Sequence, residues 1–68
     1  MIKLSLKDVA KLKGISQMEL VAKTGIRQPT ISAIYTNKCK HLPIDVIDRI
    51  CRVLNCQPSD WISYYDDK

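Results

Sequence analysis

The side chains that could ligate a metal or attack a substrate are few and scattered. The sequence holds three cysteines and one histidine, namely Cys39, Cys51, Cys56 and His41. The spacings C-x-H and C-x4-C differ from those of common structural zinc sites, and no residue stands ready to activate a thiolate. Scattered carboxylates and one histidine do not form a catalytic set, and no glycine-rich loop could cradle a phosphate. The sequence therefore predicts no enzyme activity, no bound metal and no cofactor.

Charge is distributed unevenly along the chain, which carries a formal net charge of +4. Residues 1–40 contain eight basic and two acidic residues, whereas residues 41–68 contain three basic and five acidic residues. A basic first part and an acidic end favour one face that attracts a polyanion, while the other end meets solvent or a partner. A lysine-rich solvated surface is the plain alternative, and charge alone leaves both interpretations open.

Length and composition predict one small globular domain over residues 1–68. Apolar residues make up 46% of the chain and charged residues 26%, a balance typical of folded chains. A domain of this size has a marginal core, so self-association would stabilise it. No apolar run is long enough to cross a membrane, and the start of the chain lacks the apolar region of a secretory signal. We therefore expect a cytoplasmic protein with reduced thiols and no membrane partner.

Glycines and prolines divide the chain into short helical segments. We expect an all-α domain of five helices, with a short edge strand at residues 1–4, where apolar and polar residues alternate. The helices are expected from a Ser5 cap to Gly14, Ser16 to about Thr24, Gln28 to Thr36, Pro43 to Leu54, and Ser59 to about Tyr64. The fourth presents an apolar stripe and the fifth offers side chains for burial: Ile44, Ile47, Ile50, Cys51 and Leu54, then Trp61, Ile62 and Tyr65.

The second and third helices carry the strongest local signals. Ser16 and Glu19 form a capping box, and Gly25 can adopt the left-handed conformation that ends a helix in a sharp turn. Pro29 suits the first helical position, where no backbone N–H is needed. Two helices of eight or nine residues joined by a tight turn have the spacing of a helix-turn-helix, here at about residues 16–36.

Residues 14–34 read G-I-S-Q-M-E-L-V-A-K-T-G-I-R-Q-P-T-I-S-A-I. This stretch resembles the lambda-repressor/Cro family, whose pattern is roughly S-Q-x-x-L-A-x-x-x-G-V-x-x-x-x-I-S. The residues in register are Ser16, Gln17, Leu20, Gly25, Ile26, Ile31, Ser32 and Ile34. The likeness extends over about residues 6–62, and it implies a five-helix DNA-binding domain of the Cro/CI type whose third helix enters the major groove.

The resemblance also assigns roles by position. Arg27 and Gln28 stand where family members read base edges, because arginine suits guanine and glutamine suits adenine. Further base contacts are implied for Thr30, Ser32 and Ala33. Phosphate contacts are implied for Gln17, Lys38 and Lys40. Exposed polar residues without a DNA role are the plain alternative for Arg27 and Gln28.

Several positions depart from the family pattern. Val21 replaces a small alanine, and Tyr35 replaces a glutamate whose usual arginine partner is absent at Ala10. Asn37 stands where a glycine often follows the third helix, although asparagine tolerates the left-handed conformation. Pro29 removes a polar side chain from a base-reading position, so DNA shape is expected to contribute more to recognition.

These observations predict a sequence-specific DNA-binding protein that acts as a small transcriptional regulator, and more specifically as a repressor. We expect a homodimer on two half-sites about one helical turn apart, because one domain of this size would select a genomic site too weakly. The expected dimer surface is the last two helices, with the N-terminal strand or Tyr64–Tyr65. The alternative is a protein-interaction module of the antitoxin or anti-repressor type, since a fold does not fix a function.

Overall fold

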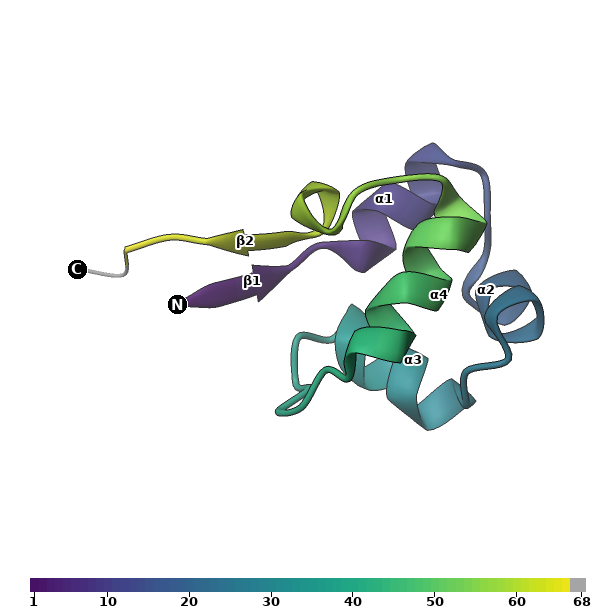
Figure 1. Ribbon diagram of the computed structural model, residues 1–68, viewed down its shortest axis with the longest axis horizontal. Helices are drawn as coiled ribbons and strands as arrows, with labels where there is room; N and C mark the ends of the chain where they lie inside the picture. The colour runs from purple at the N-terminus through teal and green to yellow at the C-terminus, as the bar shows by residue number, and fades with distance from the viewer. Residues whose placement is uncertain (67–68) are drawn as a thin grey trace.

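The computed structural model describes residues 1–66 of the chain. Its elements are β1 (Ile2–Leu4), α1 (Leu6–Leu12), α2 (Gln17–Thr24), α3 (Gln28–Tyr35), α4 (Ile44–Leu54), the 3-10 turn η1 (Pro58–Asp60) and β2 (Ile62–Tyr64). Figure 1 shows the four α-helices packed into a body, from which β1 and β2 extend together as a ribbon. The molecule measures 38 × 21 × 19 Å, and the ribbon lies along the longest axis.

One apolar core joins the helices to the base of the ribbon. Leu20, Ile31 and Ile34 are fully buried, which fixes α2 and α3 against each other. The indole of Trp61, just before β2, is also fully buried. The other core residues are Leu6, Ala10, Ile26, Ile50 and Leu54. Because every helix contributes to this small core, each helix depends on its neighbours for stability.

The junction between α2 and α3 forms as the sequence predicts. The Ser16 hydroxyl accepts a hydrogen bond from the Glu19 N–H at 3.1 Å, and the Glu19 carboxylate accepts one from the Ser16 N–H at 3.4 Å. Gly25 ends α2 in the left-handed region with φ of 73°. The buried Thr24 hydroxyl donates to the Leu20 carbonyl at 2.6 Å and accepts from the Ile26 N–H at 3.1 Å. The turn is too tight for its backbone N–H and carbonyl groups to bond to one another, so these hydrogen bonds satisfy them instead.

The expected lambda-repressor-like fold is present, but the expected fifth helix is wrong: the structure has four α-helices and a short strand pair within residues 1–66. Between α4 and residue 66 only η1 is helical; the Asp60 carboxylate accepts a hydrogen bond from the Gln57 N–H at 2.8 Å, and the turn ends one residue later. Ile62 and Tyr64 then alternate with Ser63 in a strand that pairs antiparallel with β1. Apolar and aromatic residues in alternation suit a strand, and the expected edge strand at residues 2–4 supplies the partner.

Three smaller expectations also need correction. Ile44 does not belong to the buried stripe of α4, since its side chain is 84% exposed at the start of the helix. Tyr65 is exposed beside Met1 rather than buried. Ser5 precedes α1 as expected, but its side chain makes no capping hydrogen bond. Instead, the Ser5 N–H donates to the Trp61 carbonyl at 2.8 Å, which joins the start of α1 to the end of η1.

Candidate nucleic-acid interface

The helix α3 has one buried side and one open side. Ile31 and Ile34 point into the core and hold the helix in place. Gln28 and Pro29 in the first turn are exposed, and Ser32 and Ala33 on the following turn are half-buried. Pro29 is the second residue of α3 rather than the first, because the helix begins one residue earlier. The open side is therefore narrow, formed by small or polar side chains, and able to approach a partner closely.

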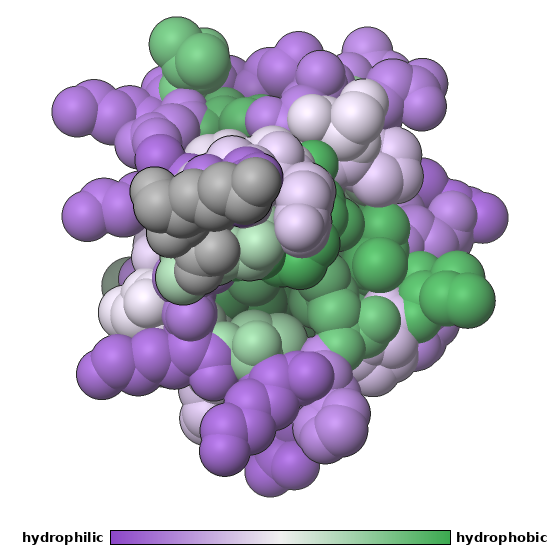
Figure 2. All heavy atoms as spheres, turned by 90° about the vertical axis from the view of Figure 1, so that its left-hand side faces the viewer, coloured by the Kyte–Doolittle hydropathy of each residue, from purple (hydrophilic) through white to green (hydrophobic). Residues whose placement is uncertain are grey.

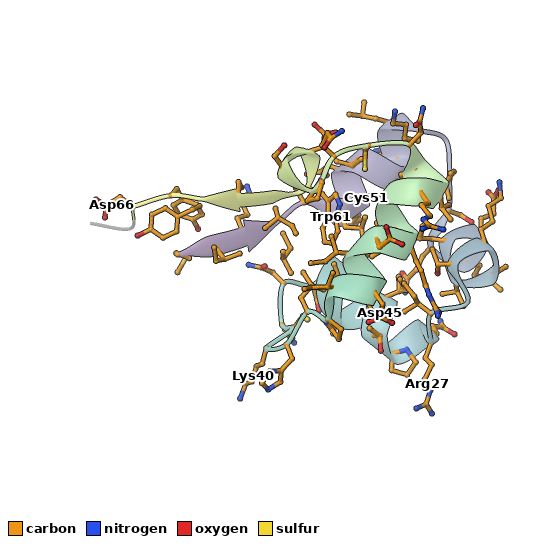
Figure 3. The ribbon with its side chains drawn as sticks, in the orientation of Figure 1. Arg27, Lys40, Asp45, Cys51, Trp61 and Asp66 are labelled. Atoms are coloured by element: carbon orange, nitrogen blue, oxygen red, sulfur yellow. The ribbon has the colours of Figure 1, made fainter. Side chains whose placement is uncertain are left out.

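Cations stand at both ends of α3. Arg27 is the residue before the first turn, and Lys38 and Lys40 lie in the segment after the last turn; all three are exposed. In Figure 3, Arg27 and Lys40 point away from the body on the same lower edge, at opposite ends of α3. An ion pair joins Asp48 to Arg52 on α4, at 3.0 Å. No carboxylate of the described chain thus neutralises the cations beside α3.

The geometry of α3 is fixed at its C-terminal end as well. The Thr36 hydroxyl donates to the Ser32 carbonyl at 3.0 Å, and Asn37 follows with a left-handed φ of 60°. The Lys38 N–H donates to the Ala33 carbonyl at 2.9 Å, which closes the end of the helix. The chain therefore leaves α3 in a defined direction, and Lys38 and Lys40 follow directly after it.

A second basic feature surrounds the start of α2. This feature is a shallow depression of about 340 Å³, which is lined by Lys7, Lys11, Gly14, Ile15, Ser16, Gln17 and Tyr35. Gln17 is the first residue of α2, where backbone N–H groups and the positive end of the helix dipole are available to an anion. Lys7 and Lys11 are exposed on α1 and face this helix start. Burial raises the pKa of the Tyr35 hydroxyl above its ordinary value of 10.0.

The structure therefore places the predicted site residues in two groups. Arg27 and Gln28 at the entrance of α3 are exposed, and Thr30, Ser32 and Ala33 within the helix are half-buried. Lys38 and Lys40 follow the end of α3, whereas Gln17 lies separately, at the start of α2.

Sequence reasoning missed the positions of Lys7, Lys11 and Tyr35 beside Gln17. The spacing of four between the two lysines places them on one face of a helix and was the available signal.

The cysteines and the histidine do not come together. The Cys39 thiol donates to the His41 carbonyl at 2.7 Å, while Cys51 and Cys56 lie beside each other at the other end of the fold, where α4 ends. Burial and the nearby Cys51 thiol raise the pKa of Cys56. Within residues 1–66, no cluster of three or more histidine, cysteine or carboxylate side chains could hold a metal ion. The helices of this part of the chain are also too short or too polar to cross a membrane.

One side of α3 is buried, a tight turn joins α3 to α2, and cations stand at both ends of α3. This arrangement is that of a helix-turn-helix DNA-binding protein. Residues 5–67 match the model of the Cro/C1-type HTH DNA-binding domain, so the chain belongs to that family. This family membership confirms the prediction that the chain is a DNA-binding transcriptional regulator of the Cro/C1 type.

Two relatives agree with this assignment. The uncharacterized HTH-type transcriptional regulator YozG of Bacillus subtilis (strain 168) is 33% identical over 60 residues, which cover 88% of this chain and 70% of YozG. Among solved structures, the complex of SinR protein and SinI protein contains a chain that superimposes with a TM-score of 0.74 at 27% identity. The likeness covers 81% of the present chain but only 53% of that chain, so the present chain spans about half its length.

Proposed function

We propose that this protein represses transcription by inserting the open side of α3 into the major groove of duplex DNA. The observation that carries the proposal is the pair of unneutralised basic ends of α3, Arg27 before it and Lys38 with Lys40 after it. Phosphates flank the groove on both sides, so cations at both ends of an inserted helix would meet both strands. A repressor needs no more than such occupancy of a promoter.

Base reading would come from the entrance of α3. Arg27 would pair with guanine O6 and N7, and Gln28 with adenine N6 and N7. Ser32 and Ala33 are close enough to the open side to meet bases, and a methyl group of Ala33 or Thr30 suits thymine. Because Pro29 provides no hydrogen-bond donor, part of the selectivity would come from DNA shape.

Phosphate contacts would come from two places. Lys38 and Lys40 would contact the backbone next to α3. Gln17 would hold a second phosphate at the start of α2, assisted by Lys7 and Lys11, which line the same depression. Two phosphate contacts, one on each side of the groove, would fix the orientation of α3 before any base is read.

We propose that the protein is a cytoplasmic homodimer in which each chain forms one domain over residues 1–68. It catalyses no reaction and binds no cofactor. A two-fold axis would present two α3 helices to half-sites one turn apart, about 34–36 Å. Doubling the contacts would raise selectivity to a level that one small domain does not reach.

Selection of bound sequences from a random DNA pool, followed by affinity titration over a range of salt concentrations, tests the proposal. We expect log K to fall linearly with log salt, by about 0.9 for each phosphate neutralised. Gln28→Ala should weaken the selected site by about 1–3 kcal/mol and relax the preference at one base position, whereas Lys38→Ala should weaken all sequences alike. Arg52→Ala, which removes an exposed cation of α4, is the matched control and should leave affinity unchanged.

A protein-interaction module is the second candidate, favoured by the apolar side chains exposed on the ribbon, Ile2 and Tyr64. If Gln28→Ala and Lys38→Ala both left DNA binding unchanged, the assignment of α3 as the recognition helix would be wrong and this candidate would replace the first.

A further inference from the structure

Two of the three cysteines meet at the C-terminal end of α4. Asn55 ends this helix in the left-handed region with φ of 52°, and its N–H donates to the Cys51 carbonyl. The Cys56 N–H donates to the same carbonyl at 3.1 Å. A helix that ends in this way brings the side chain of the second residue beyond it against a side chain of its last turn, commonly as an apolar contact. Here the two side chains in that position are free thiols.

The two thiols are close enough to react with each other. A hydrogen bond joins the side chains of Cys51 and Cys56. A disulfide needs Cα atoms about 4.4–6.8 Å apart and Cβ atoms about 3.5–4.5 Å apart. The backbone bond between the two residues already draws their main chains together. Joining the sulfurs therefore requires rotation of two side chains and leaves the path of α4 in place.

Small solutes can reach both sulfurs. Cys51 and Cys56 are half-buried, and both line a depression of about 290 Å³ on α4, beside the start of η1. In Figure 1, α4 lies toward the viewer. Figure 2, turned by 90°, shows hydrophobic side chains exposed on that side of the molecule, on the right of its view. The thiols are thus sheltered from neighbouring chains but open to a molecule as small as hydrogen peroxide.

The third cysteine provides a comparison within the same chain. The Cys39 thiol donates to the His41 carbonyl at 2.7 Å, in the segment after α3. In Figure 3, Cys51 lies on the upper half of α4, while Lys40, next to Cys39 in the chain, lies at the lower edge. One thiol is therefore bonded to the backbone, and the other two are paired.

We propose that Cys51 and Cys56 are a modification site, at which hydrogen peroxide forms a reversible disulfide within one chain. The thiolate of one cysteine attacks a peroxide oxygen, the O–O bond breaks, and hydroxide leaves and takes up the proton that the thiol released. The second sulfur then attacks the resulting sulfenic acid, the S–O bond breaks, and the oxygen leaves as water with the second thiol proton. Two thiols and one peroxide give one disulfide and two water molecules.

Cys56 fits the second of these steps. Burial and the neighbouring Cys51 raise the pKa of the Cys56 thiol from its ordinary value of 9.0, so little thiolate forms there at neutral pH. Attack on a sulfenic acid held beside it gains from proximity instead. A reducing compartment returns the disulfide to two thiols, so the bridge lasts only while peroxide is present. While it lasts, it ties the end of α4 to the turn that leads into η1.

Peptide mapping of the dilute, reduced full-length protein after brief exposure to hydrogen peroxide tests the proposal. Remaining thiols are alkylated under denaturing conditions before digestion. Trypsin cleaves at the arginines that flank Cys51, which places it on residues 50–52 and Cys56 on residues 53–68. We expect these two peptides to be joined, with alkylation confined to Cys39. The chain should lose the mass of two hydrogen atoms, and dithiothreitol should restore it.

Three variants separate the roles of the cysteines. Cys39→Ser should form the same bridge as wild type. Cys56→Ser should form none and should accumulate a sulfenic acid that dimedone traps on Cys51, whereas Cys51→Ser should accumulate far less. Oxidised Cys39→Ser should unfold at a higher urea concentration than its reduced form, because the bridge constrains the unfolded chain. Circular dichroism checks that each variant is folded.

Four outcomes would overturn the proposal. They are a bridge that includes Cys39, a bridge between two chains, separate oxidation of Cys51 and Cys56 without a bond between them, and an oxidised form that unfolds at the same or lower urea concentration. Wild type alone decides the first three, so the result does not depend on the folding of a variant. No DNA is present, so failure of the proposed function would leave this result unchanged.

Discussion

The backbone N–H of Leu4 donates a hydrogen bond to the side-chain Oδ1 of Asn37 at 3.1 Å, across 33 residues of sequence. This bond connects the end of β1 to the residue that follows α3. Asn37 has a left-handed φ of 60°, a conformation that asparagine adopts more readily than other side-chain-bearing residues. One residue thus ends the chain path that follows α3 and fixes the ribbon to it.

Substitution of Asn37 should separate its two roles. Asn37→Gly keeps the left-handed conformation and loses the hydrogen bond, so we expect a loss of about 1 kcal/mol in the free energy of unfolding. Asn37→Ala loses the bond and also strains the backbone, which adds roughly 1–2 kcal/mol. Urea denaturation measures both values. Equal losses in the two variants would show that the left-handed conformation contributes nothing.

Removal of Lys11 should reduce the dependence of DNA binding on salt. Lys11 lines the depression at the start of α2, where we propose a phosphate contact. Lys11→Ala should weaken binding to all sequences and lower the salt slope by about 1. Lys13→Ala is the matched control, since Lys13 does not line this depression. If both variants changed the slope equally, general charge rather than this depression would account for the effect.

Trp61 should tolerate phenylalanine far better than alanine. Its side chain is fully buried, yet its indole Nε1 has no hydrogen-bond partner within the described chain. Trp61→Ala opens a cavity and should cost about 3–5 kcal/mol, a large share of the stability expected for a domain of 68 residues. Trp61→Phe also loses volume, but it removes an unsatisfied N–H whose burial costs about 1–3 kcal/mol. Circular dichroism during urea denaturation checks this, and similar losses for both variants would contradict it.

The free energy of unfolding should fall in alkaline solution. Burial raises the pKa of Tyr35 above its ordinary value of 10.0. As pH rises past about 10, the unfolded state releases the proton first, so the folded state binds more protons and stability declines with pH. Below that pH, both states are protonated and this group has no effect on the pH dependence.

Tyr35→Phe should therefore show a shallower alkaline decline than wild type. Cys56, whose pKa is also raised from its ordinary value of 9.0, contributes a decline of the same sign in both proteins, so the difference between them isolates Tyr35. Thermal unfolding followed over the alkaline range provides the measurement. Parallel curves would mean that Tyr35 ionises as easily in the folded state as in the unfolded state.

Local signals predicted the central part of the fold well. Ser16 with Glu19 marks a helix start through bonds made within four residues, and Gly25 marks a helix end through its own backbone freedom. Because these interactions are encoded within one turn of chain, the sequence alone reveals them. The helix-turn-helix and its resemblance to the Cro family follow from such signals.

Non-local interactions explain the failures. The segment from Ile62 to Tyr64 could form a helix or a strand, and its conformation depends on β1, about 60 residues away, which no short window contains. Ile44 sits in helical register with Ile47, but the body ends before it can cover the first turn of α4. The depression around Gln17 was missed for the same reason, since Lys11 and Tyr35 meet there only after three helices have packed.

The pairing of β1 with β2 imposes an order on assembly. The Ser63 hydroxyl lies 3.5 Å from the Lys3 carbonyl, with all four helices contained in the loop between them. During synthesis, the segment that forms α3 leaves the ribosome well before Tyr64, so α3 can form while β1 still lacks its partner strand. β1 therefore pairs with β2 only after Tyr64 has been synthesised, so the ribbon is the last part of the described fold to form.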